Sequence, residues 1–227
     1  YSQELQKEND SPYARGNPFL RDKEPINTDM LKESHLVSTG EELLRPLIFS
    51  NGKLYLQRYY QYETEIIEGI QRLIDAPGLE HDEALQAQKS LIAHLFNNHP
   101  TGTGPDWQLV ASLRTLMTGF MIITGGPGTG KTTTVAKLLA LYFSIKPDAR
   151  VVLAAPTGKA AARMNESLAS SRKKLEGLST EVMAGFDTIH ASTIHRLLGW
   201  QMHSTSFRHN RDNPLDVNMV IIDEASM

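Results

Sequence analysis

A glycine-rich run of eight residues, Gly125-Gly126-Pro127-Gly128-Thr129-Gly130-Lys131-Thr132, constrains the fold of this chain more than any other feature. It matches the pattern G-x-x-x-x-G-K-[ST], in which glycines let successive backbone N–H groups turn inward around phosphate oxygens, where a Cβ atom would clash. An apolar run at 120–124 precedes the glycines, and a helical pattern at 131–145 follows them. Strand, loop and helix in this order predict an α/β domain that binds phosphate at a helix N-terminus.

The chain continues to alternate between predicted strands and helices after this loop. A strand is expected at 151–155, a helix from there to about residue 172, and a further strand at 219–223. Continuous apolar strands separated by helices indicate a parallel sheet that is covered by helices on both faces. The polar stretches 173–190 and 200–218 are expected to be connections without regular structure.

The first hundred residues have a different character. Residues 1–40 are polar and rich in turn-forming residues, so we expect them to be disordered, loosely ordered or packed on a partner. Asn51-Gly52 between two apolar runs predicts a β-hairpin, and helical patterns follow at 66–74 and 85–96. This region is therefore predicted to form a small α+β domain.

A Gly- and Pro-rich segment at 97–105 is the clearest break in the chain. No helix or strand tolerates that density of glycine and proline, so we place a domain boundary near residue 100. The expected domains are residues 1–100 and 106–227, and Asp106 is the expected N-cap of the first helix of the second domain.

The glycine loop carries the residue types that a bound nucleotide requires. Lys131 is expected to reach the β- and γ-phosphates of ATP, and the Thr132 hydroxyl is expected to bind Mg²⁺. The other expected contacts with the nucleotide come from Gly126, Pro127, Gly128, Thr129, Gly130 and Thr133. The alternative is a glycine-rich turn with a chance lysine, but the predicted strand before the loop and helix after it favour the phosphate site.

Two adjacent carboxylates, Asp223 and Glu224, follow the last predicted strand, 92 residues after Lys131. Such a strand delivers Asp223 to the carboxyl edge of the sheet, where ligands bind in open α/β folds. We expect Asp223 to hold Mg²⁺, and Glu224 to orient and deprotonate the water that attacks the γ-phosphate. An Asp-Glu pair alone is usually a solvated loop. Its spacing from Lys131 predicts that both places converge on one magnesium–nucleotide, and the second carboxylate favours hydrolysis over a kinase reaction.

Composition excludes several other classes of protein. The 227 residues are 40% hydrophobic and include no cysteine, so a disulfide framework and a thiolate zinc site are excluded. No apolar run approaches the roughly 18 residues of a membrane span. Residues 1–106 carry 10 Lys and Arg against 17 Asp and Glu, whereas residues 107–227 carry 13 against 9. The mildly basic second half permits phosphate contacts, but this charge alone does not predict nucleic-acid binding.

Three further segments accompany the phosphate loop and the acidic pair. Gln108 lies 17 residues before Gly125, APTGKAA occupies 155–161, and STIHRLL occupies 192–198. Together with the final DEASM, this series resembles the superfamily-one helicases, most closely the RecD-like helicases, which include the alpha subunit of bacterial exodeoxyribonuclease V. The dense match covers about half of the chain, and the likeness in the hairpin region is fainter. The resemblance implies a RecA-like P-loop NTPase domain.

The resemblance also implies roles for individual residues. Gln108 matches a glutamine that reads the adenine edge, where an amide offers one donor and one acceptor. DNA-contacting motifs of the family match Thr157, Gly158, Lys159, Thr193 and His195. Each match has an ordinary structural alternative: a surface glutamine, a helix N-cap with a solvated lysine, and a packed or capping histidine.

The activity implied by the resemblance is ATP-dependent 5′→3′ translocation along single-stranded DNA in double-strand break repair and recombination. The implied partners are single-stranded DNA and sister subunits of the RecBCD complex, with RecC-type docking through the N-terminal domain, in the bacterial cytoplasm. The sequence ends just after the acidic pair. We therefore expect this chain alone to bind nucleotide weakly, to hydrolyse it poorly and not to unwind DNA.

Other functions remain open at this point. A stand-alone RecD-like helicase or a conjugative relaxase-type helicase would carry the same motifs. A P-loop NTPase or kinase that does not act on DNA would leave the segments at 156–161 and 193–198 unexplained. An assembly module with a vestigial loop would not bind ATP.

Overall fold

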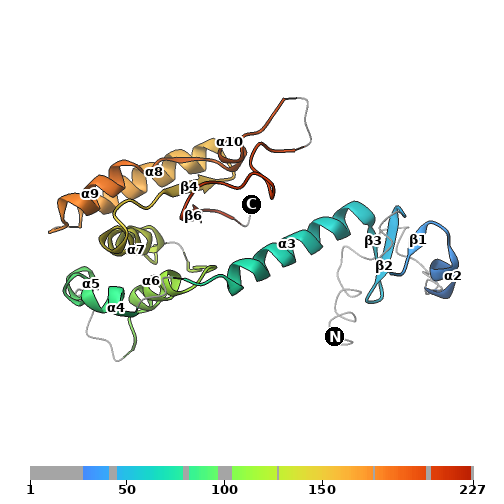
Figure 1. The fold of residues 1–227 in the computed structure, drawn as a ribbon, viewed down its shortest axis with the longest axis horizontal. Coiled ribbons are helices and arrows are strands. Elements are labelled where there is room, and N and C mark those ends of the chain that lie inside the picture. The colour runs from blue at the N-terminus through green and yellow to red at the C-terminus, as the bar shows by residue number, and fades with distance from the viewer. Residues whose placement is uncertain are drawn as a thin grey trace, which may run out of the picture. The chain divides into compact units, whose positions relative to one another are not determined.

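The computed structural model describes residues 28–40, 45–78, 82–96, 104–126, 128–175, 177–202 and 206–225. The chain divides into two compact units, Tyr1–Gly69 and Ile70–Met227, each with its own sheet. Figure 1 labels most of the helices and strands of both units. Of the segment predicted to be loosely ordered, residues 1–27 lie outside the described residues, and 28–40 contain a helix and a short strand.

The first unit is built around a small mixed sheet. Its elements are α2 (Thr28–Glu33), β1 (Val37–Ser38), β2 (Leu47–Ser50), β3 (Lys53–Leu56) and the larger part of α3 (Gln57–Asp75). Strand β2 pairs in parallel with β1 and antiparallel with β3. The predicted hairpin is confirmed, because Asn51 and Gly52 connect β2 to β3 with φ values of 52° and 75°, as a type I′ turn requires.

The second unit contains a three-stranded parallel sheet in the order β5-β4-β6. Its elements are α4 (Asp82–Ala87), α5 (Lys89–Phe96), α6 (Trp107–Met117), α7 (Lys131–Ile145), β4 (Val151–Ala155), α8 (Gly158–Lys173), α9 (Thr180–Asp187), β5 (Ala191–Thr193), α10 (Ile194–Leu198) and β6 (Met219–Ile222). The predicted helix at 131–145 and strand at 151–155 are confirmed, and the predicted helix after β4 is α8.

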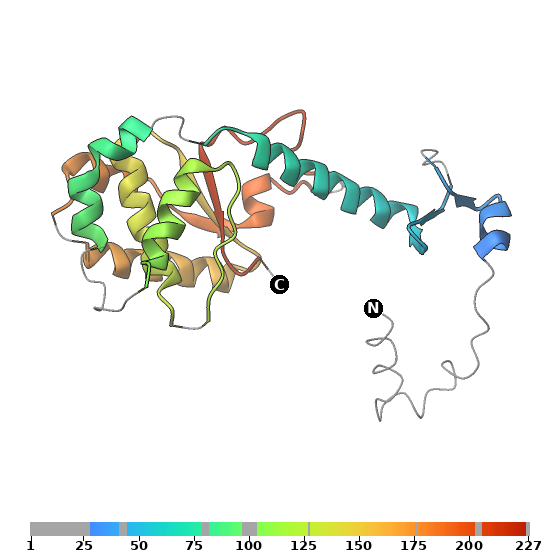
Figure 2. The same ribbon diagram turned by 90° about the horizontal axis from the view of Figure 1, so that it is seen from below.

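Helix α7 is the centre of the core of the second unit. It lies between α5 and α6 on one side and α8 and α9 on the other, and α6 runs beside it (Figure 1 and Figure 2). All six side chains of residues 138–143 are buried. Helix α9 approaches α7 closely at Gly185, where a Cβ atom would lie 2.5 Å from the Phe143 ring. A glycine at 185 therefore lets α9 pack against α7.

The domain boundary predicted near residue 100 is misplaced, because the compact units divide between Gly69 and Ile70. Helix α5 packs on α7 and α4 packs on α5, and Leu85, Leu95 and Phe96 are buried in the same core cluster as the residues of α7. The Lys137 ammonium of α7 lies 4.6 Å from the centroid of the Phe96 ring, which is a cation–π contact. The Gly- and Pro-rich break thus connects parts of one unit.

The strand predicted at 120–124 is absent, since residues 120–126 have no regular structure. The backbone of Thr118 forms a bridge with Pro77, and Gly119 approaches the Leu73 carbonyl so closely that a Cβ atom would lie 2.1 Å from it. This contact fixes the start of the segment 120–126 beside the end of α3. In the described part of the chain, β6 therefore pairs with β4 alone. Ile122 is consequently 70% exposed.

Two further predictions differ from the structure. The pattern at 85–96 belongs to two helices, α4 and α5, which are separated at Gln88. The stretch predicted to be an irregular connection at 173–190 contains α9, whose first turn is capped by the Ser179 hydroxyl accepting from the Val182 N–H. This cap and the buried Val182 and Phe186, four residues apart, were the local signals for a helix.

Candidate functional site

The glycine loop forms a tight turn that ends in the N-terminus of α7. Gly128 and Gly130 have φ values of 76° and 84°, which glycine adopts without the steric cost that other residues incur. The Thr129 hydroxyl donates to the Gly126 carbonyl at 2.9 Å and closes the turn. Pro127 lies outside the described residues.

The start of α7 has the donor groups that a phosphate requires. Gly130 is the N-cap and has no side chain that could satisfy the first N–H groups of the helix. The Lys131 ammonium donates to the carbonyl oxygens of Gly125 and Gly126, at 2.6 and 3.0 Å, and so lies against the loop. A Cβ atom at Gly125 would lie 2.7 Å from the Thr129 hydroxyl oxygen, which shows how closely the loop is wound. These groups fit a nucleotide phosphate.

Three consecutive threonines follow Lys131, and the structure separates their roles. Thr134 is buried, and its hydroxyl donates to the Gly130 carbonyl at 3.1 Å, so it serves the helix. Thr132 and Thr133 are partly exposed, and within the described part of the chain neither hydroxyl makes a hydrogen bond. Their oxygens are therefore available to a ligand or a metal ion.

Gln108 lies beside the glycine loop, as an adenine-reading residue should. The Asp106 carboxylate caps α6 by accepting from the N–H groups of Gln108 and Leu109, at 2.9 and 3.1 Å, which confirms the predicted cap. The Gln108 amide Nε2 then donates to the Thr129 carbonyl at 3.3 Å, across 21 residues of sequence. The cap of α6 thus places the glutamine next to the phosphate loop.

The parallel sheet brings three of the predicted segments to one edge. Residues 155 and 193 are register partners in β4 and β5, and residues 154 and 222 are partners in β4 and β6. The segments that begin at Pro156, Ile194 and Asp223 therefore leave the sheet at the same carboxyl edge. The Asp223 N–H donates to the Ala154 carbonyl at 3.0 Å, which extends the ladder by one residue.

The two threonines among the predicted DNA contacts are helix caps. The Thr157 hydroxyl accepts from the Ala160 N–H at 3.2 Å, and the Thr193 hydroxyl accepts from the Arg196 N–H at 3.2 Å. Gly158 is the first residue of α8, and the Lys159 side chain is exposed. His195 is exposed and makes an edge contact with Phe207 at 5.8 Å between ring centroids. The capping alternative thus describes both threonines, and Lys159 and His195 keep exposed polar groups.

The acidic pair has an unusual backbone. Glu224 has a φ of 52°, a conformation that costs a non-glycine residue about 1 kcal/mol, and its N–H donates to the Asp223 carboxylate at 2.9 Å. Both side chains are exposed. Among the described residues, no hydrogen bond or ion pair joins Asp223 or Glu224 to the glycine loop. The convergence of the two places on one ligand remains a prediction.

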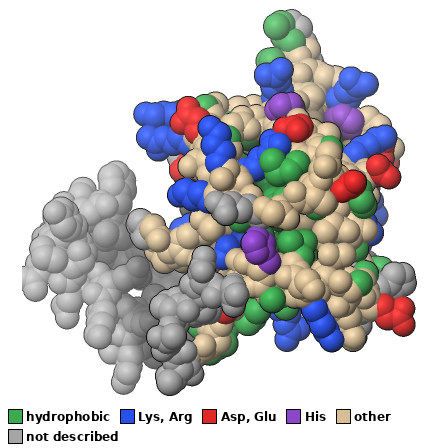
Figure 3. Space-filling view, turned by 90° about the vertical axis from the view of Figure 1, so that its left-hand side faces the viewer, with side chains coloured by type: hydrophobic (Ala, Val, Ile, Leu, Met, Phe, Trp, Pro, Cys, Tyr) green, Lys and Arg blue, Asp and Glu red, His purple; other side chains and the backbone are tan. Residues whose placement is uncertain are grey.

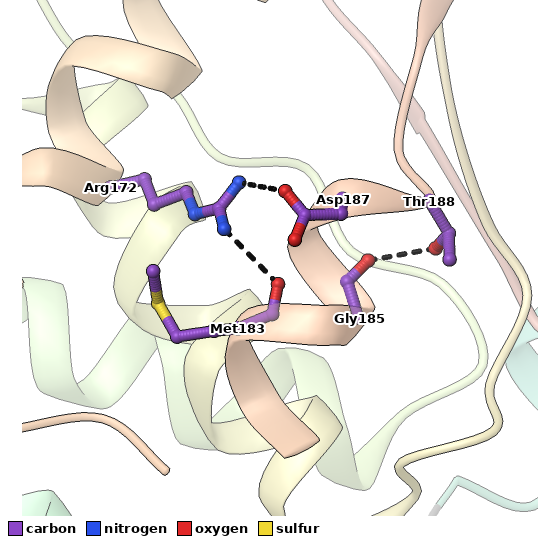
Figure 4. Close-up of polar contacts among 5 residues, drawn as sticks. All are labelled: Arg172, Met183, Gly185, Asp187 and Thr188. Carbon is purple, nitrogen blue, oxygen red and sulfur yellow. Dashed lines mark hydrogen bonds and ion pairs between the residues drawn. The ribbon is translucent and has the colours of Figure 1, made fainter. Parts of the chain in front are cut away.

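An ion pair that sequence reasoning missed connects α8 to α9 (Figure 4). The Arg172 guanidinium donates to the Asp187 carboxylate at 2.6 Å and to the Met183 carbonyl at 3.2 Å, and it lies 5.7 Å from the centroid of the Phe186 ring. The hydrogen bond from Arg172 lowers the pKa of Asp187 below its ordinary value of 3.8. This contact fixes the last turn of α8 against α9.

Charge is mixed on the face drawn in Figure 3, where Lys and Arg side chains lie among Asp, Glu and apolar side chains. This face does not present a continuous basic field for a phosphate backbone. None of the described helices is at once long enough and apolar enough to cross a bilayer.

A model of the AAA domain family matches residues 108–227, which is more than half of the chain. The chain belongs to the AAA domain family. Its second unit accordingly has the P-loop NTPase fold, and the matched range includes the glycine loop at 125–132.

The resemblance to RecD-like helicases is confirmed by curated relatives. The chain is 39% identical to the RecBCD enzyme subunit RecD of Mycolicibacterium smegmatis over 77% of its length, and 35% identical to that of Haemophilus influenzae over 85%. It is 38% identical to the ATP-dependent RecD2 DNA helicase of Deinococcus radiodurans over 47% of its length. The chain covers 30% of each of the two RecD proteins and 12% of the RecD2 helicase.

Proposed function

We propose that this chain is the nucleotide-binding part of an ATP-dependent DNA helicase subunit that acts in double-strand break repair and recombination. The observation that carries the proposal is the shared edge of the parallel sheet. The two predicted DNA-contacting segments follow β4 and β5, and the acidic pair follows β6, so all three leave the sheet at this edge. The names of the RecD and RecD2 relatives support the same function.

The glycine loop and the start of α7 would hold ATP. The Lys131 ammonium would exchange the carbonyls of Gly125 and Gly126 for the β- and γ-phosphates, and the free N–H groups of the first helical turn would face the same oxygens. Thr132 and Asp223 would hold Mg²⁺, which would neutralise charge on the phosphates. The Gln108 amide would leave the Thr129 carbonyl to read the adenine edge.

Glu224 would act as the general base. Its carboxylate is exposed at the end of β6, directly after the carboxylate assigned to the metal. From there it would orient a water molecule and accept its proton as the γ-phosphate is attacked. The left-handed backbone at Glu224 supports a functional role, because strained residues cluster at active sites.

Single-stranded DNA would lie across the starts of α8 and α10, which follow β4 and β5. Thr157, Gly158 and Lys159 would contact a phosphate of the strand at the N-terminus of α8, and Thr193 and His195 would contact it at the start of α10. Contacts of this kind hold the backbone without reading its sequence. Translocation would run 5′→3′, as the resemblance implies.

The first unit would dock this subunit onto a sister subunit of a complex such as RecBCD in the bacterial cytoplasm, in the manner of RecC-type docking. Helix α3 has no buried residue, and Tyr59, Tyr62, Ile66 and Ile67 on it are all strongly exposed. Tyr59, Tyr62 and Ile66 are spaced three and four residues apart, so they share one face. An exposed apolar face on a subunit similar to RecD suits a permanent protein partner.

The ATPase rate of the full-length protein with its sister subunits, measured with and without single-stranded DNA, tests the proposal. We expect DNA to raise the rate, and Lys131→Gln to weaken ATP binding or abolish turnover. An ATPase that ignores DNA would favour an NTPase or kinase that does not act on DNA, and a protein that does not bind ATP would favour an assembly module. The isolated chain is expected to hydrolyse ATP poorly and not to unwind DNA.

A stand-alone helicase is the second candidate, and the similarity to the RecD2 helicase favours it. The first unit decides between the two. Replacing Ile66 and Ile67 with aspartate should abolish co-purification with sister subunits if the protein is a complex subunit, with Glu68→Gln as the matched control on the same helix. A protein that unwinds DNA alone and co-purifies with no partner would establish the stand-alone function, which a relaxase-type helicase would share.

A further inference from the structure

Asn165 joins the two segments that are proposed to contact DNA, although it belongs to neither. It lies on α8, and its Oδ1 accepts a hydrogen bond from the Ala191 N–H at 2.8 Å while its Nδ2 donates to the Ala191 carbonyl at 3.4 Å. Ala191 is the first residue of β5. One side-chain amide therefore satisfies both backbone groups of this residue.

The contact replaces a missing strand. Strand β5 pairs with β4 and, within the described residues, has no strand on its other edge. A neighbouring strand would offer Ala191 one acceptor and one donor, and the Asn165 amide offers the same two groups. The contact of 2.8 Å is the stronger of the two, because N–H···O bonds weaken beyond about 3.2 Å.

The position of Asn165 gives this contact a functional consequence. Helix α8 begins at Gly158, two turns before Asn165, and β5 ends at Thr193, two residues after Ala191. Lys159 and His195 thus lie at the starts of α8 and α10, next to the elements that this amide fixes to each other. One strand of DNA can contact both helix starts only if their separation is held, because a misplacement of about 1 Å is costly in a preorganised site.

We propose that Asn165 is a positioning residue for single-stranded DNA, which sets the spacing between the segment Thr157–Lys159 at the start of α8 and the segment Thr193–His195 at the start of α10. This proposal rests on the proposed function. The amide touches neither DNA nor nucleotide, and it acts through β5. Loss of the amide should therefore lower the affinity for DNA and leave ATP binding unchanged.

The test uses the full-length protein with its sister subunits and compares Asn165→Ala with Asn165→Asp. Three quantities are measured: the oligo-dT concentration that gives half-maximal ATPase stimulation, the KM for ATP, and kcat at saturating DNA. For Asn165→Ala we expect a rise of about tenfold in the half-saturating oligo-dT concentration. The net free energy of two lost hydrogen bonds corresponds to a change of about tenfold in affinity. The KM for ATP and kcat should stay within about twofold.

Asn165→Asp separates positioning from simple loss of stability. It keeps the acceptor for the Ala191 N–H, but its second oxygen faces the Ala191 carbonyl, so it should recover only part of the DNA affinity that Asn165→Ala loses. Ser167→Ala is the control, because Ser167 is exposed on the same helix and makes no hydrogen bond within the described part of the chain. The unfolding temperature of each variant is measured alongside.

The proposal is overturned if Asn165→Ala lowers the unfolding temperature but leaves the half-saturating oligo-dT concentration unchanged, because the contact would then be structural alone. It is also overturned if the KM for ATP rises as much as the DNA requirement. If the unsubstituted protein shows no DNA stimulation, the proposed function fails first. If stimulation is present and Asn165→Ala behaves like the Ser167→Ala control, only the positioning role fails.

Discussion

The Gln108 amide donates to the Thr129 carbonyl at 3.3 Å, so the residue matched to adenine recognition is hydrogen-bonded to the loop matched to phosphate recognition. Gln108 lies in the first turn of α6, and Thr129 lies 21 residues later, after the irregular segment that follows the helix. The Asp106 cap makes this possible, because it starts α6 beside the loop. One side chain thus connects the two ends of the proposed nucleotide site.

Replacing Gln108 with alanine should raise the KM for ATP and weaken the preference for ATP over GTP. An amide that makes two hydrogen bonds with the base contributes on the order of 1 kcal/mol for each, so a rise of about tenfold or more is expected. Steady-state kinetics of the intact protein with both nucleotides measures it. Arg114→Ala, at an exposed position on α6, serves as the control. An unchanged preference for ATP over GTP in Gln108→Ala would show that Gln108 does not read the base.

Replacing Gly130 with alanine should weaken nucleotide binding and lower the unfolding temperature. The φ of 84° costs an alanine about 1 kcal/mol, and its Cβ atom would lie 2.7 Å from the Gln108 amide nitrogen. Titration with a fluorescent ATP analogue should show binding weaker by about tenfold. Gly104→Ala is the matched control, because a Cβ atom there meets nothing within 4 Å. Equal behaviour of the two variants would contradict this account of the loop.

The parts of the fold that the sequence predicted are those with strong local signals. Helix α7 follows a glycine N-cap and carries a long apolar run, and β4 is a continuous apolar stretch, so their bounds could be predicted. The three-residue strand β5, with sequence AST, has no such signal. It exists because β4 and Asn165 supply partners for its backbone, which no local pattern reveals.

Two predictions failed because a local signal was overruled by tertiary contacts. The Gly- and Pro-rich run at 97–105 was interpreted as a domain boundary, but the burial of Phe96 against α7 places α5 in the second unit. The apolar run at 120–124 has the composition of a buried strand, yet the bridge between Pro77 and Thr118 fixes its start elsewhere. The candidate site residues come from motifs and stay predictions, whereas no motif indicates the contact of Asn165 with Ala191, because that contact depends on the partner strand that β5 lacks within the described residues.

Stability at low pH should depend on Asp187. Its pKa is lowered in the folded chain by the hydrogen bond from Arg172, so the contribution of this contact is present above the ordinary pKa of 3.8 and is lost as the pH falls through the lower folded value. Asp187→Asn should lower the unfolding temperature near neutral pH and flatten its decline at acidic pH. Thermal unfolding followed by circular dichroism between about pH 7 and pH 2 measures both effects. Asp212→Asn, at an exposed carboxylate without an ion pair among the described residues, is the control, and identical profiles for the two variants would contradict the prediction.

Glu224→Gln should separate ATP binding from hydrolysis in the intact protein. The amide keeps the size of the carboxylate but cannot accept a proton from water, so the hydrolysis rate should fall by about 10²- to 10⁴-fold while ATP remains bound. The backbone should be unaffected, because the Glu224 N–H donates to the Asp223 carboxylate and the glutamate side chain takes no part in that bond. Single-turnover hydrolysis and equilibrium binding of ATP, measured on the same preparation, distinguish the two steps. Glu166→Gln, at an exposed glutamate on α8, controls for the loss of one negative charge. A Glu224→Gln protein that hydrolyses ATP at the unsubstituted rate would assign the general base to another residue.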